Sequence, residues 1–108
     1  MKLLLDENLP KKLKEAFGDA HQVFTVGDMK WNGKRNGELL GLMVYHGFEG
    51  LVTIDKNLPY QQNISKFDLF IIVLEAPNNK IETLKPFAAT FLELAESPLE
   101  NKVLSVRL

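Results

Sequence analysis

Several acidic residues follow directly on short apolar stretches of the sequence. If those stretches are strands of one parallel sheet, their carboxyl ends meet at one edge, which is where such sheets bind ligands. Carboxylates gathered there repel one another unless a cation neutralises them, and hard oxygen ligands suit Mg²⁺ or Mn²⁺. The acids expected at this edge are Asp6 and Glu7 after residues 2–5, Asp55 after residues 51–54 and Glu75 after residues 69–74, with Glu38 in the first turn of an expected helix.

Three of these acids also have a purely structural alternative. Asp6 could cap the turn before the first helix, and Glu38 could favour the positive end of its own helix. Asp55 could be an ordinary turn residue. The placement of all three at one expected edge favours a functional acidic site over three independent structural roles.

The elements that must position these acids alternate along the chain. Short apolar stretches predict strands, and apolar residues at helical spacing predict helices between them. This alternation indicates one α/β domain over residues 1–108, with three α/β/α layers and a mostly parallel sheet of four or five strands. The strands are expected at residues 2–5, 23–26, 51–54, 69–74 and 103–106, and the helices at 9–17, 36–46 and about 83–96.

Local signals predict where some of these helices begin and end. Asn36 is a favourable N-cap, and Gly47 follows the end of the same helix. Pro86 fits the last helix only if that helix begins near Thr83, because proline is tolerated in a first turn. The connections expected to be irregular are residues 29–35 and a polar loop through Pro59, Gln61, Gln62 and Asn63.

Composition excludes several classes of function. The chain has 108 residues, no cysteine and a formal net charge of −1, which excludes disulfides, thiol nucleophiles and bulk attraction to nucleic acid. The longest apolar stretch, residues 69–74, is far shorter than the roughly 20 residues that cross a bilayer. We therefore expect a cytoplasmic protein with no membrane partner, in which any nucleic acid binds through a local cationic patch.

Three motifs, in this order and spacing, carry a family resemblance. They are Leu4-Leu5-Asp6-Glu7-Asn8-Leu9-Pro10, then Trp31-x-Gly33-x-x-Asn36-Gly37-Glu38-Leu39-Leu40, and then Val52-Thr53-Ile54-Asp55-Lys56-Asn57-Leu58. Together they resemble the small bacterial PIN-like proteins, relatives of the PIN-domain ribonucleases that serve as toxins in VapBC-type toxin–antitoxin pairs. The resemblance covers roughly residues 2–75.

The resemblance implies a metal-dependent endoribonuclease that hydrolyses RNA phosphodiesters with a carboxylate-held Mg²⁺ or Mn²⁺ ion. Carried over by position, it makes Asp6 the first metal ligand, Glu38 the acid on the middle helix and Asp55 the acid after the Thr-x-Asp strand, while Glu7 is a further candidate ligand. The implied partners are an RNA substrate and a cognate antitoxin protein, and a homodimer is a further possibility.

Two positions depart from the family pattern. Asn36 and Asn57 stand where many relatives have Asp, so the site would hold its metal less tightly or lack a second ion. A catalytically silent PIN-like module that binds a partner is therefore the alternative function.

A basic loop, residues 30–35, offers candidate contacts for RNA. Its cations could bind phosphates, and the Trp31 ring could stack on an unpaired base. The alternative for Trp31 is that its ring covers the core. The candidate substrate-binding residues are Lys30, Trp31, Lys34, Arg35, Asn36 and Asn57.

A phosphoacceptor receiver domain is the less favoured alternative. Asp55, Pro59 and Lys85-Pro86 superficially resemble that family. However, a receiver carries its Lys-Pro after the fifth strand, and no helix of normal length fits between Asp55 and Leu69. Neither His21 nor His46 is placed as a catalytic base.

Overall fold

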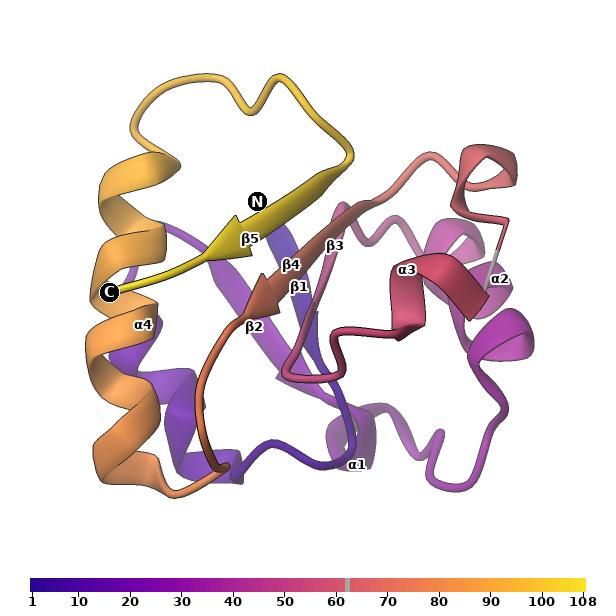
Figure 1. Ribbon diagram of the computed structural model, residues 1–108. Helices are drawn as coiled ribbons and strands as arrows, with labels where there is room; N and C mark the ends of the chain where they lie inside the picture. The colour runs from indigo at the N-terminus through magenta and orange to yellow at the C-terminus, as the bar shows by residue number, and fades with distance from the viewer. Residues whose placement is uncertain (62) are drawn as a thin grey trace.

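The computed structural model describes residues 1–61 and 63–108 (Figure 1). Gln62, which belongs to the expected polar loop, lies outside the described residues. The strands form a single five-stranded sheet in the order β2-β1-β3-β4-β5, and each neighbouring pair is parallel. Their bounds are β1 (Lys2–Leu5), β2 (Gln22–Thr25), β3 (Gly50–Thr53), β4 (Phe70–Leu74) and β5 (Val103–Val106).

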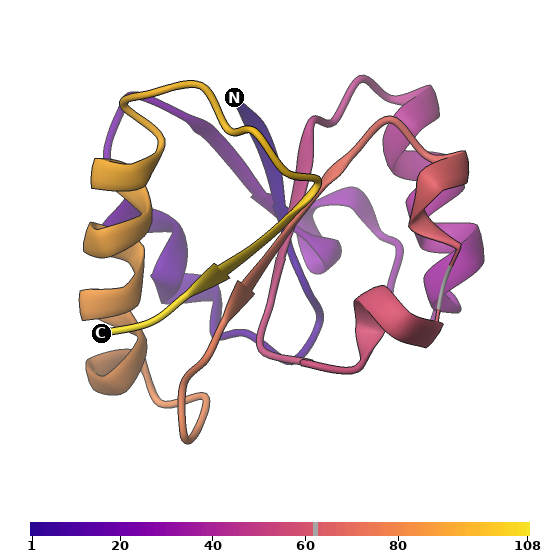
Figure 2. The same cartoon turned by 45° about the horizontal axis from the view of Figure 1, so that its top comes forward.

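Helical segments cover both faces of this sheet, which confirms the expected three-layer α/β/α architecture (Figure 2). One face carries η1 and α4, and the other carries α2 and α3. The segments are the 3₁₀ helix η1 (Lys11–Phe17), α1 (Val26–Met29), α2 (Asn36–Tyr45), α3 (Leu58–Gln61), the 3₁₀ helix η2 (Ile64–Lys66) and α4 (Ile81–Leu94).

The central strands are apolar at consecutive positions because both of their faces are buried. Side chains alternate between the faces along a strand, so Leu3 and Leu5 pack with η1 and α4, whereas Leu4 packs on the opposite side with α2. The same alternation separates Ile72 from Ile71 on β4. Each continuous apolar stretch therefore contributes side chains to the hydrophobic cores on both faces of the sheet.

The connection from β4 to β5 differs in hand from the other three. Both η1 and α4 pack on the same face, yet β2 and β5 lie at opposite edges of the sheet. The connections from β2 to β3 and from β3 to β4 run over the other face, through α2 and α3. They share the hand of the β1–η1–β2 connection. Since nearly all parallel crossovers have one hand, the β4–α4–β5 connection is the exception.

The structure corrects the expected end of the second strand. Val26 was predicted to close the strand but begins α1 instead. The physical reason is a capping box, in which Thr25 Oγ1 accepts from the Asp28 amide and Asp28 Oδ2 accepts from the Thr25 amide, each at 2.9 Å.

Other predicted element boundaries were wrong as well. Asn36 is the first residue of α2 rather than its cap, which is Arg35. Because α4 begins at Ile81, Pro86 lies inside the helix instead of in its first turn. Part of the expected polar loop forms α3, since Leu58 is fully buried in the core beneath it.

Gly50 lies where the central strands pack too closely for a larger side chain. A Cβ atom there would lie 2.9 Å from Ile72 Cδ1 and 3.0 Å from Leu3 Cδ2, and both neighbours are fully buried. We expect Gly50→Ala to lower the free energy of unfolding by about 1–3 kcal/mol in urea denaturation, since overpacking forces buried side chains to shift.

The matched control is Gly41→Ala in α2, where an added Cβ would meet no atom within 4 Å. This change should leave stability equal or higher, because alanine is the better helix former. Equal effects at the two positions would contradict the close packing assigned to Gly50.

Candidate functional site at the carboxyl edge of the sheet

The sheet reverses its strand order between β1 and β3. These strands are neighbours, but β2 lies beyond β1 and β4 lies beyond β3. Ligand sites of open parallel sheets occur at such a switch point, outside the carboxyl ends of the strands. Asp6 directly follows β1 and Asp55 lies two residues after β3, so both acids stand at the switch point.

The hydroxyl of Thr53 connects these two acidic residues. Thr53 is fully buried, and its Oγ1 donates to Asp6 Oδ2 at 2.7 Å while accepting from the Asp55 amide at 3.0 Å. The Asp6 amide donates to the Val52 carbonyl at 2.9 Å, which fixes the Asp6 backbone to β3. The end of β1 and the loop after β3 therefore form one hydrogen-bonded unit.

Further backbone donors orient the two carboxylates. Asp6 Oδ1 accepts from the Glu7 amide at 2.8 Å, and Asp55 Oδ1 accepts from the Asn57 amide at 2.9 Å. Both acidic residues remain half-buried. Across residues 1–61 and 63–108, neither of them takes part in an ion pair. They are held in place by neutral donors and keep their capacity to bind a cation.

The remaining acids expected at the edge make contacts of their own. Glu7 Oε1 accepts from Asn32 Nδ2 at 3.2 Å and from the Gly33 amide at 3.1 Å, which ties the loop after α1 to the end of β1. Glu38 is exposed and lies 3.7 Å from Lys34 Nζ. Glu75 pairs with Arg107.

The switch point offers few carboxylates for a divalent ion. In the described part of the chain, no three His, Cys, Asp or Glu side chains are gathered as a metal site, so Asp6, Glu38 and Asp55 do not form the expected trio here. Mg²⁺ is commonly held by one or two carboxylates together with substrate phosphates and water. Asp6 and Asp55 match that smaller number of carboxylates, and their role as ligands, like that of Glu38 and Glu7, stays a prediction.

Thr53 was not among the candidate site residues. Its signal in the sequence is a hydroxyl residue at the end of an apolar strand, two positions before an acid. A buried hydroxyl requires a hydrogen-bond partner, and here the Asp6 carboxylate accepts from it while the Asp55 amide donates to it.

The basic loop divides into buried and exposed parts. Trp31 is only 8% exposed and packs on the rings of His46 and Phe48, with centroids 5.2 and 5.8 Å away. Its ring therefore covers the core, which was the structural alternative. The other candidate substrate contacts remain accessible, with Asn36 half-buried and Lys30, Lys34, Arg35 and Asn57 exposed.

The lysine and the helices that a receiver domain needs are placed differently here. Lys85 lies on α4 and not after β5, where a receiver domain would carry its lysine, and the β3–β4 connection holds short helical pieces. His21 precedes β2 and so lies at the amino edge of the sheet, away from Asp6; burial lowers its pKa, with the nearby N-terminal amine adding to the effect.

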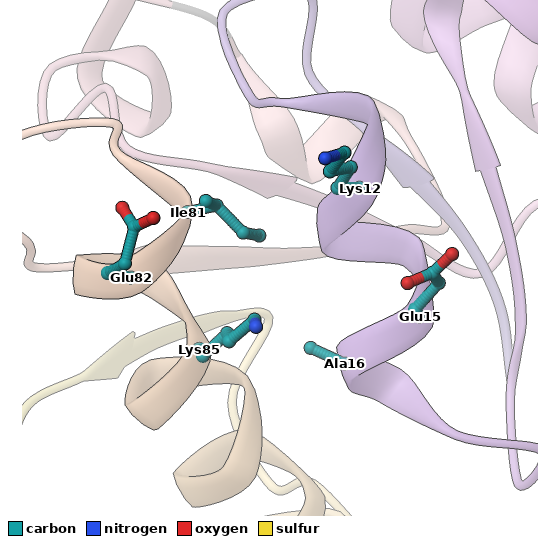
Figure 3. Close-up of a pocket in the computed structure, with 6 residues that line it drawn as sticks. All are labelled: Lys12, Glu15, Ala16, Ile81, Glu82 and Lys85. Carbon is teal, nitrogen blue, oxygen red and sulfur yellow. The ribbon is translucent and has the colours of Figure 1, made fainter.

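A larger cavity lies away from the switch-point acids, between η1 and α4 (Figure 3). Its volume is about 530 Å³, and Ala16 and Ile81 point into the gap between the two segments. Lys12 and Lys85 are matched there by Glu15 and Glu82, so the charges of the side chains that line this groove cancel.

No model of a known protein family matches the chain, and no match is found among curated proteins or solved structures. The PIN-like resemblance therefore stays a prediction from the three motifs. Among the helices that the structure describes, none has the length and apolar character needed to cross a membrane.

Trp31→Ala tests the role of the indole ring in the core. We expect the substitution to lower the free energy of unfolding by about 3–5 kcal/mol, because it removes a large buried ring. Tyr45→Ala is the control, since Tyr45 is 85% exposed. Urea denaturation measures the free energy of unfolding of both variants. A small loss of stability in Trp31→Ala would contradict the core role and favour an RNA contact for the ring.

The ion pair of Asp28 makes the stability of the fold depend on pH. Lys14 Nζ lies 2.7 Å from Asp28 Oδ2, and this contact, with the Thr25 amide, lowers the pKa of Asp28 from 3.8 to about 2. A lowered pKa stabilises the folded state above the unfolded pKa, and this stabilisation is lost as pH falls through the folded pKa. We expect Asp28→Asn to cost on the order of 1 kcal/mol at neutral pH, with the difference from wild type vanishing between about pH 4 and pH 2.

The exposed Asp19 supplies the control for this titration. Denaturation curves of Asp19→Asn and wild type should show no such pH-dependent difference. A stability gap at Asp28 that persists unchanged at the lowest pH would contradict the ionic origin of the effect.

Proposed function

We propose that this protein is a Mg²⁺- or Mn²⁺-dependent endoribonuclease of the toxin–antitoxin type, acting in the cytoplasm. The observation that supports the proposal most is the pair of half-buried acids, Asp6 and Asp55, linked through Thr53 at the switch point of the sheet. The resemblance of the three motifs to PIN-like proteins supplies the reaction class.

In this proposal Asp6 and Asp55 hold the divalent ion from the ends of two adjacent strands. When bound, such an ion supplies positive charge for a phosphodiester and lowers the pKa of a water molecule that attacks phosphorus. Thr53 keeps Asp6 oriented by its 2.7 Å hydrogen bond. The amide of Asn57 does the same for Asp55, so a hydrogen bond orients each carboxylate before an ion binds.

The side chains of Asn36 and Asn57 have a separate part in the proposal. Both are amides, which bind sugar hydroxyls or phosphate oxygens without adding negative charge. At the positions where many PIN-like relatives carry Asp, they reduce the number of carboxylates available to metal. The proposed site therefore holds one ion and turns over slowly.

A catalytically silent, partner-binding module is the second candidate. The specific observation that favours it is that Glu38 points to Lys34 rather than joining a group of three acids within the described residues. In that case a protein partner such as an antitoxin, or a second copy of the chain, would be the physiological ligand.

Cleavage of RNA with Mg²⁺ or Mn²⁺ decides between the two candidates. We expect Asp6→Asn and Asp55→Asn each to lower the cleavage rate by about 10²-fold or more, since each removes one anionic ligand. Removal of the ion by a chelator should abolish cleavage, and added Mn²⁺ should restore it. The measurement is the initial rate on a labelled mixed-sequence single-stranded RNA.

Asp19→Asn, purified in parallel, controls for contaminating nuclease because Asp19 precedes β2 at the opposite edge of the sheet. Expression in cells with and without the neighbouring gene tests the toxin role. Cleavage that survives Asp55→Asn, or an absence of both cleavage and growth inhibition, would leave the silent module as the better account.

A further inference from the structure

A small pocket opens beside Asp6 at the carboxyl ends of β1 and β2. Its volume is about 180 Å³, smaller than the pockets of about 300 Å³ or more that enclose drug-sized ligands. It has room for a phosphate and part of a sugar. The polar and glycine residues that line it are Asp6, Glu7, Lys11, Thr25, Gly27 and Asn32.

Lys11 is the one cationic side chain among the residues that line this pocket. It is exposed, and in the described part of the chain it makes no ion pair or side-chain hydrogen bond. Two other nearby cations are engaged, since Lys14 pairs with Asp28 at 2.7 Å and Lys34 lies 3.7 Å from Glu38. The charge of Lys11 is therefore available to a ligand.

The basic loop is a weaker source of positive charge for this pocket. Glu7 binds the loop through Asn32 and the Gly33 amide, so the loop meets the pocket with polar groups. Lys30, Lys34 and Arg35 are not among the residues that line the pocket. An anionic substrate strand beside Asp6 would meet carboxylates and a single cation.

We propose that Lys11 binds a phosphate of the single-stranded RNA substrate in this pocket, next to the Asp6 carboxylate. This inference rests on the proposed function, because it names the substrate contact of the same site. The ammonium group offsets the repulsion between the phosphate and the neighbouring acids. A phosphate contact carries no base information, so Lys11 contributes affinity without sequence preference.

The salt dependence of RNA binding tests the proposal. The Asp55→Asn protein in Mg²⁺ serves as the background, so that a labelled mixed-sequence single-stranded oligoribonucleotide stays intact during the measurement. We expect Lys11→Ala to flatten the log–log salt slope by about 0.7, the value for one phosphate contact on a single strand. The affinity ratio between background and variant should then shrink by about 2.6-fold for each fourfold rise in salt.

Lys12→Ala is the matched control. Lys12 is the next residue of η1, is also exposed, and lines the groove toward α4 instead of the Asp6 pocket (Figure 3). Its loss should change the slope much less, and Lys11→Arg should retain the slope of the background. Equal losses at Lys11 and Lys12, an unchanged slope in Lys11→Ala, or no RNA binding by the background would each overturn the proposal.

The inference and the proposed function can fail separately. If the wild-type protein does not cleave RNA but Lys11→Ala still flattens the salt slope, the phosphate contact stands and the nuclease proposal fails. If wild type cleaves in a metal-dependent way and Lys11→Ala changes neither affinity nor KM, the nuclease proposal stands and the Lys11 contact fails. Unchanged thermal unfolding of Lys11→Ala excludes misfolding as the cause of any loss.

Discussion

The parallel direction of all five strands is the constraint on which the rest of this structure depends. It requires a crossover segment between each successive pair of strands, and it brings every strand to its end at the same edge. At the switch point, two strands distant in sequence deliver Asp6 and Asp55 to one place. The buried Thr53 hydroxyl then converts this proximity into a fixed arrangement, because each of its hydrogen bonds goes to a different strand end or loop.

The acids at that edge fall into two groups that differ in their contacts. Glu7, Glu38 and Glu75 are each engaged, by the loop after α1, by Lys34 and by Arg107 respectively. Asp6 and Asp55 receive hydrogen bonds from neutral groups alone in the described part of the chain. Of the five acids expected at this edge, three are thus occupied by a cation or a loop, and two remain able to bind a divalent ion.

Features that depend on burial could be predicted from the sequence, whereas features that depend on local hydrogen bonds could not. The strand at residues 103–106 was predicted with its exact bounds, because its apolar residues stand between polar neighbours. The start of α1 at Val26 depends on the reciprocal bonds of Thr25 and Asp28, which compete with strand pairing. The position of Glu38 is set by the loop before α2 and by Lys34, and no periodicity in the sequence encodes that geometry. Asp6 and Asp55 follow the strands that were expected to precede them, and Glu38 lies on the expected helix. Only Asp6 and Asp55 belong to one hydrogen-bonded unit.

The opposite hand of the β4–α4–β5 connection has a consequence for the chain as it leaves the ribosome. Because α4 packs beside η1, the apolar face formed by Leu3, Leu5, Leu13 and Phe17 is covered by a helix that is synthesised after the first four strands. The first three strands and α2 can assemble their other face earlier, since Leu4, Leu40 and Leu51 meet there. A chain synthesised only to the end of β4 therefore contains every buried residue of that core but leaves the opposite face of the sheet without α4. Such an exposed apolar surface attracts chaperones or other nascent chains.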